Sequence, residues 1–230
     1  MLRHGTAEPA REMSKHADRL ISAGSPKAGA KRLMDLAGGL VGLLAAAPLL
    51  CVSAVAIVLN DRGPALFAQA REGHEGRTIR VWKLRTMLVD GDAVLAHHLL
   101  AHPTAQQEWE TYFRLANDPR TLGRLGRVLR RFSIDELPQF WNVVRGDMSL
   151  VGPRPLPAYV LDTLPAEFVR LRRSVRPGLT GLWQVSGRSD GDMAELVRMD
   201  TEYLKLASFA LDLRILARTP AIVLTGVGAY

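Results

Sequence analysis

Cysteine is nearly absent from this chain of 230 residues, which contains only Cys51. A single thiol excludes a disulfide within the chain and a cysteine-rich zinc site. It also fits a protein whose working parts face a reducing compartment. Aromatic residues are scarce as well, at 6% of the sequence. They are too few to give evident stacking platforms for nucleic-acid bases.

Acidic residues are outnumbered by basic ones, which gives a formal net charge of +7. Such an excess predicts anionic partners, namely nucleic acid, anionic lipid or phosphorylated substrates. Because aromatic residues are few and a long apolar run is present, we expect no nucleic-acid partner. Apolar residues make up 47% of the chain and charged residues 23%, which is typical of a folded protein and not of a disordered one.

Charge is missing altogether from residues 36–59. As a helix this run would reach about 36 Å, enough to cross the core of a bilayer. A buried core helix is the alternative, and the uncharged length makes it the weaker interpretation. A cleaved signal peptide fits less well, because the run begins late and the residues before Cys51 are not the small ones that a cleavage site needs.

Pro48 lies near the middle of this run and should bend or break the helix, because proline removes a backbone donor and clashes with the preceding turn. A spanning helix usually has its basic excess on one side only. Here basic residues flank both sides: Lys27, Lys31 and Arg32 before the run, and Arg62, Arg71, Arg77 and Arg80 after it. We therefore expect a re-entrant membrane helix hairpin at 27–60, broken at Pro48, with a spanning helix as the alternative. A flexible tail is expected at 1–26.

Residues 61–230 predict a small helix-rich α+β domain. Short strands are expected at 65–70 and 78–84, around a glycine-rich turn at 73–76. Helices are expected at 94–114, 122–131, 137–144, 166–173 and 192–206, with a loop at 146–157. The apolar segment 211–223 carries two arginines, which predicts an amphipathic helix at a membrane interface.

Two adjacent carboxylates, Asp135 and Glu136, are the first candidates for chemistry. One carboxylate can attack phosphorus to give an acyl phosphate, and the other can hold Mg²⁺, which prefers oxygen ligands. A structural alternative is a helix capping box formed by Ser133 and Glu136. Pro138 argues against that alternative, because it disfavours helix at the residue before it.

Basic residues near this pair could bind phosphate. The prolines of Gly152-Pro153-Arg154-Pro155 would hold the backbone around Arg154, whose planar fork matches phosphate oxygens. Among the arginines in 120–131, Arg130 is close in sequence to the acidic pair and is the one that we expect to contact phosphate. Lys83 and Arg85 end a predicted strand. The alternatives are a rigid loop with a solvated arginine for Arg154, a solvated basic face for the 120–131 set, and a strand-edge charge pair for Lys83 and Arg85.

Glycines at 178, 181 and 187 would permit close approach of the backbone to a ligand, although ordinary turns use the same residues. Three histidines, His97, His98 and His102, invite a metal interpretation. No HExxH pattern accompanies them, so a solvated helix face is expected instead.

Considered together, the order and spacing of these segments resemble those of the bacterial sugar transferase family, the monotopic polyprenyl-phosphate hexose-1-phosphate transferases. The resemblance runs from about residue 31 to residue 230 and is strongest in six stretches: 82–87 (WKLRTM), 118–121 (DPRT), 129–139 (LRRFSIDELPQ), 146–155 (GDMSLVGPRP), 176–181 (RPGLTG) and 183–188 (WQVSGR). The chain resembles a short form that begins exopolysaccharide assembly.

The resemblance implies a two-step reaction. Asp135 would attack the sugar-bearing phosphate of a UDP-sugar, with glucose or galactose favoured, and release UMP. Undecaprenyl phosphate would then take the phosphosugar, and Glu136 would bind Mg²⁺, or Mn²⁺ in its place. Six basic residues would bind substrate phosphates: Arg130, Arg154, Lys83, Arg85, Arg120 and Arg188.

The resemblance also implies a location. Residues 61–230 would form a catalytic domain on the cytoplasmic face of the bacterial inner membrane, held against anionic lipids by basic residues. The sequence leaves the oligomeric state open, and a homodimer is compatible with it. A non-enzymatic basic membrane scaffold is the competing hypothesis; it explains the apolar run but not the grouping of Asp135, Glu136 and Arg154.

Overall fold

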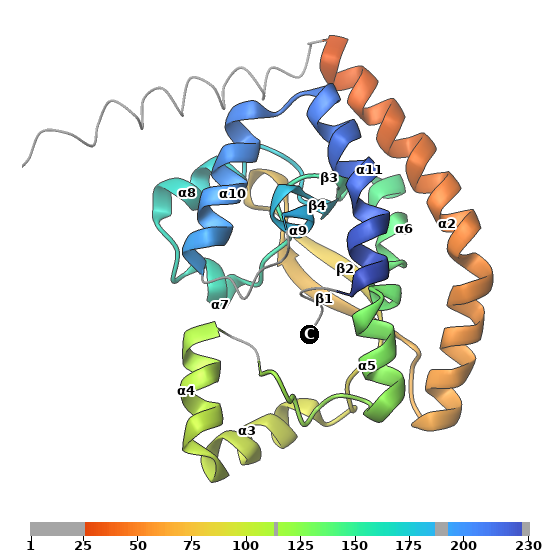
Figure 1. The fold of residues 1–230 in the computed structure, drawn as a ribbon, viewed down its shortest axis with the longest axis vertical. Helices are drawn as coiled ribbons and strands as arrows, with labels where there is room; N and C mark the ends of the chain where they lie inside the picture. Colours follow the sequence, from red (N-terminus) through yellow and green to blue (C-terminus); the bar gives the residue numbers. More distant parts are fainter. Residues whose placement is uncertain (1–25, 113–114, 187–192, 227–230) are drawn as a thin grey trace, which may run out of the picture.

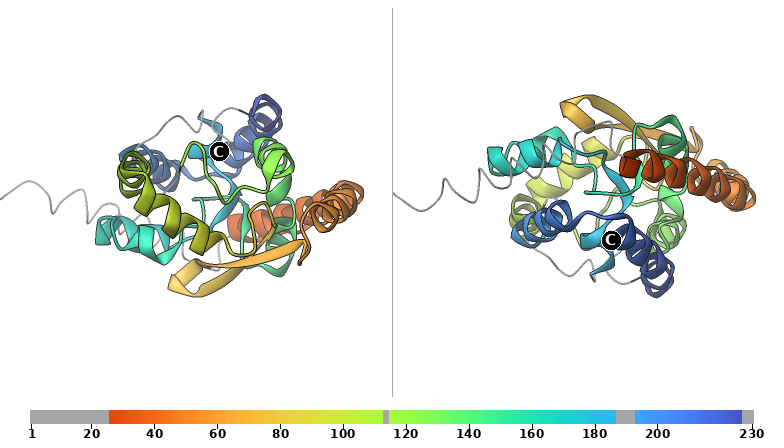
Figure 2. Two further views of the ribbon diagram at one scale, coloured as in Figure 1. Left: turned by 90° about the horizontal axis from the view of Figure 1, so that it is seen from below. Right: turned by 90° about the horizontal axis from the view of Figure 1, so that it is seen from above.

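A computed structural model describes residues 26–112, 115–186 and 193–226, and in it helices surround two small sheets (Figure 1). The helices are α2 (Pro26–Asn60), α3 (Gly91–Ala101), α4 (Pro103–Tyr112), α5 (Gly123–Arg131), α6 (Gln139–Arg145), α7 (Ala158–Leu161), α8 (Ala166–Arg172), α9 (Leu182–Val185), α10 (Met193–Leu206) and α11 (Phe209–Thr225), with short 3₁₀ turns η1 (His74–Gly76) and η2 (Ile134–Glu136). The expected helix-rich α+β class is confirmed. Both views of Figure 2 agree with Figure 1 in placing α2 and α8 on opposite sides of the molecule.

The two sheets have two strands each. Strands β1 (Leu66–Glu72) and β2 (Thr78–Leu84) form the predicted antiparallel hairpin. Strands β3 (Ser149–Val151) and β4 (Gly178–Thr180) pair in parallel, and the sequence did not predict them. With three residues each, they are too short to show a period of two.

The single helix expected at 94–114 is wrong, because the structure has two helices there, α3 and α4. Between them His102 has an extended backbone, with φ −132° and ψ 93°. It precedes Pro103, and the residue before a proline is driven out of the helical region by contact with the proline ring. The chain therefore turns at this point.

The long apolar helix is present as α2, but the structure does not confirm a hairpin. α2 is one continuous helix with Pro48 inside it, and it bows around one side of the molecule (Figure 1). A proline removes one backbone hydrogen bond, which can bend a helix without ending it when strong helix formers continue on both sides. By length and composition, residues 29–60 could cross a membrane, and the mean hydropathy reaches 2.5 over an 18-residue stretch of this helix.

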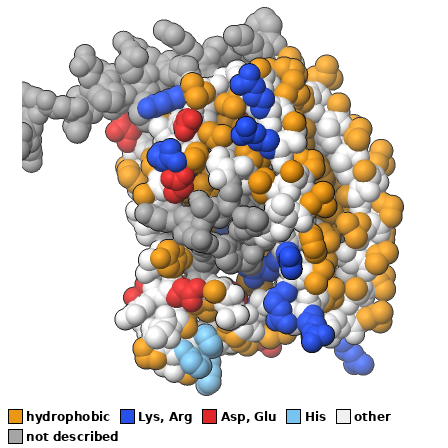
Figure 3. All heavy atoms as spheres, in the orientation of Figure 1, with side chains coloured by type: hydrophobic (Ala, Val, Ile, Leu, Met, Phe, Trp, Pro, Cys, Tyr) orange, Lys and Arg blue, Asp and Glu red, His pale blue; other side chains and the backbone are white. Residues whose placement is uncertain are grey.

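One side of α2 packs on the domain and the other is exposed and apolar. Asp35, Ala46, Ser53 and Ile57 are buried. The exposed side carries large aliphatic residues: Leu40, Val41, Leu44, Val52, Val55 and Val58. In Figure 3 hydrophobic side chains cover the edge of the molecule that α2 occupies in Figure 1. This distribution fits a helix with lipid on one side and protein on the other.

Two of the basic residues before the uncharged run, Lys31 and Arg32, contact the rest of the domain. Lys31 Nζ donates to Asp212 Oδ2 at 2.5 Å and to the carbonyl oxygen of Val151 at 3.1 Å. Arg32 donates to the carbonyl oxygens of Val143 and Val144, both at 2.8 Å, at the end of α6. Carbonyls in the last turn of a helix lack some of their intrahelical partners, and the Arg32 guanidinium donates to two of them, of which Val143 also accepts from the Gly146 N–H.

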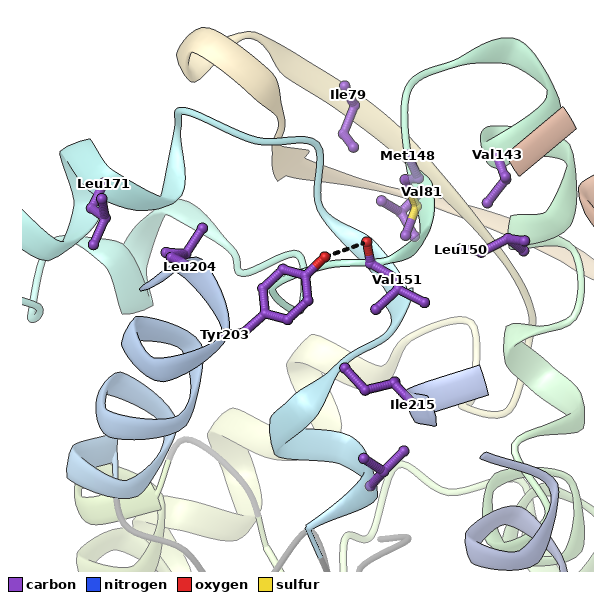
Figure 4. Close-up of a cluster of buried hydrophobic side chains, with 11 residues drawn as sticks. Ile79, Val81, Val143, Met148, Leu150, Val151, Leu171, Tyr203, Leu204 and Ile215 are labelled. Carbon is purple, nitrogen blue, oxygen red and sulfur yellow. Dashed lines mark hydrogen bonds between the residues drawn. The ribbon is translucent and has the colours of Figure 1, made fainter. Parts of the chain in front are cut away.

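The main core lies between β2, β3, α6, α10 and α11 (Figure 4). Val143, Met148, Val151, Leu204 and Ile215 are among its buried side chains. The hydroxyl of Tyr203 lies in this core and shares its single hydrogen between Asp212 Oδ1, at 2.9 Å, and the carbonyl oxygen of Val151, at 3.2 Å. The core thereby fixes β3, and the candidate site begins just after this strand.

Candidate active site

The two carboxylates lie on η2, a tight turn between α5 and α6. The residue before the turn, Ser133, has φ +52°, a left-handed conformation that non-glycine residues rarely adopt. The backbone turns sharply there, and both acids point inward, with 7% exposure for Asp135 and 9% for Glu136. The alternative of a capping box is wrong, because the Ser133 side chain makes no capping hydrogen bond. α6 begins later than predicted, with Pro138 as its N-cap.

Glu136 holds two cations that come from distant parts of the chain. Lys83 Nζ donates to Glu136 Oε1 at 2.8 Å. Arg154 Nη2 donates to the same oxygen at 2.6 Å, and Arg154 Nη1 lies 3.4 Å from Oε2. Burial alone would raise the pKa of Glu136, but Arg154 and Lys83 outweigh burial and hold that pKa well below its usual range. Glu136 is therefore a carboxylate at neutral pH, and it in turn raises the pKa of Arg154.

Asp135 has a different environment from its neighbour. Its carboxylate forms no hydrogen bond or ion pair with the residues that the structure describes. Burial raises its pKa to about 6, and Lys83 opposes this rise. Such a carboxylate is charged at neutral pH but poorly solvated, and a poorly solvated anion is a better nucleophile than a hydrated one.

Arg130 is the member of the 120–131 arginine set that lies near the carboxylates. It is half-buried at the end of α5. Burial lowers its pKa, and the charge of Asp135 opposes this effect most strongly. The arginines at 124, 127 and 131 are exposed, as the solvated-face alternative predicted for most of the set.

The loop that carries Arg154 is held by close backbone packing. A Cβ atom at Gly152 would lie 2.6 Å from the carbonyl oxygen of Arg176, and one at Gly178 would lie 2.1 Å from the nitrogen of Gly152. Gly181 also approaches Gly152. The glycines at 178 and 181 therefore allow the backbone around β4 to pack directly on the backbone at Gly152, after β3. This packing corrects the interpretation that they make room for a ligand.

A buried arginine supports the same loop from the other side. Arg172 of α8 donates to the backbone carbonyl of Arg154. With its other arm it donates to Asp200 Oδ2 of α10 at 2.5 Å. Arg172 and Asp200 are both buried, at 7% and 1% exposure, so the pair is rigidly placed. α8 and α10 thus position Arg154 against Glu136.

Two predicted phosphate-binding residues are engaged elsewhere. Arg85 donates to Asp61 and, at 2.8 Å, to the carbonyl oxygen of Pro64, so it fastens the end of β2 to the turn after α2. Arg120 pairs with Asp118 at 2.6 Å and lies over the ring of Trp109 at 5.0 Å. The structure therefore brings neither of them to Glu136, and Arg188 lies outside the described residues.

Sequence reasoning missed Arg71 as a member of the site. A pocket of about 70 Å³ beside Glu136 is lined by Arg71, Val81, Lys83, Glu136, Gln139, Arg154, Pro155 and Leu156. In the hairpin register Arg71 is opposite Ile79, which shares a face of β2 with Lys83. This alternation was the signal that could have found it. A larger hollow of about 460 Å³ lies along α10 alone and contains none of these residues.

Comparison with known proteins identifies the family. The family model for the bacterial sugar transferase matches residues 26–226. The chain belongs to the bacterial sugar transferase family. This sugar transferase is 41% identical over 201 residues to the exopolysaccharide production protein ExoY of Rhizobium meliloti, which covers 87% of the chain and 88% of that protein.

Two further relatives carry names that describe a reaction. The undecaprenyl-phosphate galactose phosphotransferase of Salmonella typhimurium is 40% identical over 200 residues. The alignment covers 87% of the present chain and 41% of the Salmonella protein. The UDP-glucose:undecaprenyl-phosphate glucose-1-phosphate transferase of Caulobacter vibrioides is 41% identical over 207 residues. That alignment covers 87% of the present chain and 72% of the Caulobacter protein. The expected family is therefore confirmed.

Proposed function

We propose that this protein transfers a hexose-1-phosphate from a UDP-sugar to undecaprenyl phosphate and thereby starts exopolysaccharide assembly. The named relatives act with galactose or glucose, and we propose one of these as the sugar. The observation that carries the proposal is the pairing of two unlike carboxylates. Asp135 is buried without a hydrogen-bonded partner among the described residues, whereas Glu136 organises Lys83 and Arg154.

In the proposed first step an oxygen of Asp135 bonds to the sugar-bearing phosphorus. The bond between this phosphorus and the bridging oxygen breaks, and its electron pair leaves with UMP. In the second step an oxygen of undecaprenyl phosphate attacks the same phosphorus, and the bond to Asp135 breaks. The products are undecaprenyl diphosphate-sugar and the regenerated carboxylate, so no net proton transfer is needed.

Lys83, Arg154 and Arg130 are proposed to bind the substrate phosphates. The first two are already aimed by Glu136, at 2.8 and 2.6 Å, which limits the entropy lost when substrate arrives. Burial lowers the pKa of Arg130 and the charge of Asp135 opposes that effect, so Arg130 is close enough to act on the same phosphate. Together they would stabilise the negative charge that moves from the reacting phosphorus to the leaving phosphate.

The carboxylates also fit the Mg²⁺ ion that we propose as cofactor, with Mn²⁺ as a substitute. Magnesium is commonly held by one or two carboxylates together with substrate phosphate oxygens. Glu136 stays ionised, as a metal ligand must, and Asp135 is adjacent. Because Lys83 and Arg154 now hold Glu136, we expect metal and substrate to bind together. When bound, the ion would neutralise phosphate charge.

We propose that α2 enters the membrane from the cytoplasmic face and returns to it. Both halves of the helix contact the same domain: Arg32 reaches α6, and Ile57 belongs to a cluster with Leu122 and Leu129 of the α5 region. Because both ends of the helix are attached to one domain, both ends should lie on the side of the membrane where that domain lies. The helix would then sit in one leaflet and not cross both. Anionic lipids would hold the exposed arginines of α5.

Purified protein in detergent, supplied with Mg²⁺, undecaprenyl phosphate and a panel of UDP-sugars, provides the test. We expect UMP release with one sugar, and none from Asp135→Asn. Release of UDP would show transfer of the sugar without its phosphate and would refute the proposal. If Asp135→Asn released UMP at the wild-type rate, the proposed covalent step through Asp135 would be refuted.

A further inference from the structure

Arg71 is a cation of the site pocket that lacks a carboxylate partner among the described residues. Its guanidinium donates to the side-chain oxygen of Gln69. The neighbouring acid, Glu72, is held by Arg173 at 2.5 Å. Glu136 accepts from Lys83 and Arg154. The charge of Arg71 is therefore left for something that enters the pocket.

The pocket suits a small anion. Its volume of about 70 Å³ is far below the roughly 300–1,000 Å³ that holds a drug-sized ligand. Guanidinium and ammonium groups reach it from three segments, through Arg71 on β1, Lys83 on β2 and Arg154 on the loop after β3. A single phosphate group matches both the size and the charge of this space.

Electrostatics adds to this geometry. Burial, together with repulsion from Arg154, lowers the pKa of Arg71 to about 10, so the side chain stays charged at neutral pH. The charge of Glu136 opposes this lowering only in part, and a bound anion would oppose it further. The pocket lining has three cations, Arg71, Lys83 and Arg154, and one carboxylate, Glu136, which leaves an excess of positive charge that a phosphate group would balance.

We propose that Arg71 binds the phosphate that is not transferred, first that of the departing UMP and then that of the incoming polyprenyl carrier. This inference rests on the proposed function. In phosphoryl transfer the attacking and leaving oxygens lie roughly in line. UMP therefore leaves on the side opposite Asp135, and the carrier phosphate must attack from that same side. One subsite serves both groups in turn.

The charge changes of the two steps match this role. When the bridging bond breaks, the nucleotide phosphate gains a negative charge; when the carrier phosphate bonds to phosphorus, it loses one. A guanidinium in the subsite stabilises the more charged state in both cases, so it assists departure and binds the attacking group. Arg71 can do this because the hydrogen bonds of Glu136 go to Lys83 and Arg154 and leave the Arg71 guanidinium available to a phosphate.

The test compares Arg71→Gln and Arg71→Lys with wild type in detergent. Equilibrium binding of UMP and of uridine is measured without any donor, and the KM for undecaprenyl phosphate is measured with it. Arg77→Gln is the matched control, because Arg77 is an exposed arginine of the same hairpin and pairs with Glu75 at 2.8 Å. Folding of each variant is checked by its unfolding transition.

We expect Arg71→Gln to weaken UMP binding about 10- to 100-fold and to raise the carrier KM similarly, since charge-assisted hydrogen bonds have this strength. Uridine binding should not change, Arg71→Lys should lie in between, and Arg77→Gln should match wild type. Unchanged UMP binding, an equal loss of uridine binding, or an effect on only one of the two phosphates would overturn the inference. Wild-type protein that neither binds nor releases UMP would instead refute the proposed function.

Discussion

Replacing Asp135 by asparagine should abolish transfer and also make the protein more stable at neutral pH. Burial raises the pKa of this carboxyl from 3.8 to about 6 against the opposing effect of Lys83. The folded state therefore binds the proton more tightly than the unfolded chain does. Asparagine is nearly the same shape and cannot ionise, so it removes the penalty of holding a charge in this place.

The size and pH range of the effect follow from linkage. One pKa unit is about 1.4 kcal/mol, so the rise from 3.8 to about 6 corresponds to about 3 kcal/mol. The free energy of unfolding of the wild type should fall as pH rises from about 4 to about 6, where the folded state holds more protons than the unfolded state. Above that range the full penalty is present; below pH of about 4 both states are protonated and it disappears.

Thermal unfolding in detergent with a chelator would measure this at pH 7.5 and pH 4. At roughly 2–4 °C per kcal/mol for a chain of this size, Asp135→Asn should melt up to about 6–12 °C above wild type at pH 7.5 and near it at pH 4. Asp162→Asn, at an exposed acid, is the control. Adding Mg²⁺ should narrow the difference, because only the wild-type carboxylate gains a ligand. A variant less stable than wild type at pH 7.5, or an equal gain at both pH values, would refute the reasoning.

Three further predictions concern the same region. UMP release by wild type should decline below a pH of about 6, as Asp135 becomes protonated; a kcat/KM profile that is flat down to pH 5 would contradict this. Arg172→Lys cannot bind Asp200 and the Arg154 carbonyl with two arms at once, and it should lower kcat about 10-fold. In a double-mutant cycle, Arg154→Lys should therefore cost less in the Arg172→Lys protein than in the wild type. Gly152→Ala should destabilise by about 1–3 kcal/mol or prevent folding, since its Cβ would lie 2.6 Å from a backbone oxygen, whereas Gly29→Ala has nothing within 4 Å and should be tolerated in the same denaturation assay.

The parts of the fold that the sequence predicted are those with a strong local signal. The uncharged run at 36–59 leaves few structures other than a long helix, and the strands at 65–70 and 78–84 have a glycine-rich turn between them. The effect of Pro48 was harder to predict, because a proline can bend or end a helix and the outcome depends on packing around it. In α2 the packing of both halves on the domain accompanies a continuous helix.

Side-chain partners were the least predictable part of the site. Arg85 and Arg120 stand in the same motifs as residues near the two carboxylates, but they form ion pairs with Asp61 and Asp118, and no local pattern reveals these partners. Arg71, in contrast, was not among the predicted site residues but lines the pocket. Its position on the same face of the sheet as Lys83 can be predicted only when the register of the hairpin is known. Grouping by motif found Asp135, Glu136, Lys83 and Arg154 as candidates; geometry was needed to show which of these touch.

The packing of α2 also bears on why such a site can serve a lipid-bound substrate. Lys31, at the start of α2, and Tyr203, in the core, both donate to the carbonyl oxygen of Val151. Arg154 follows three residues later, and Arg172 fixes its backbone in turn. If α2 is seated in the membrane as proposed, this short connection sets the height of Arg154 above the lipid with little freedom. A fixed height is what the reaction requires, because one phosphate arrives from water and the other stays attached to a chain in the bilayer, so they can meet only at one level.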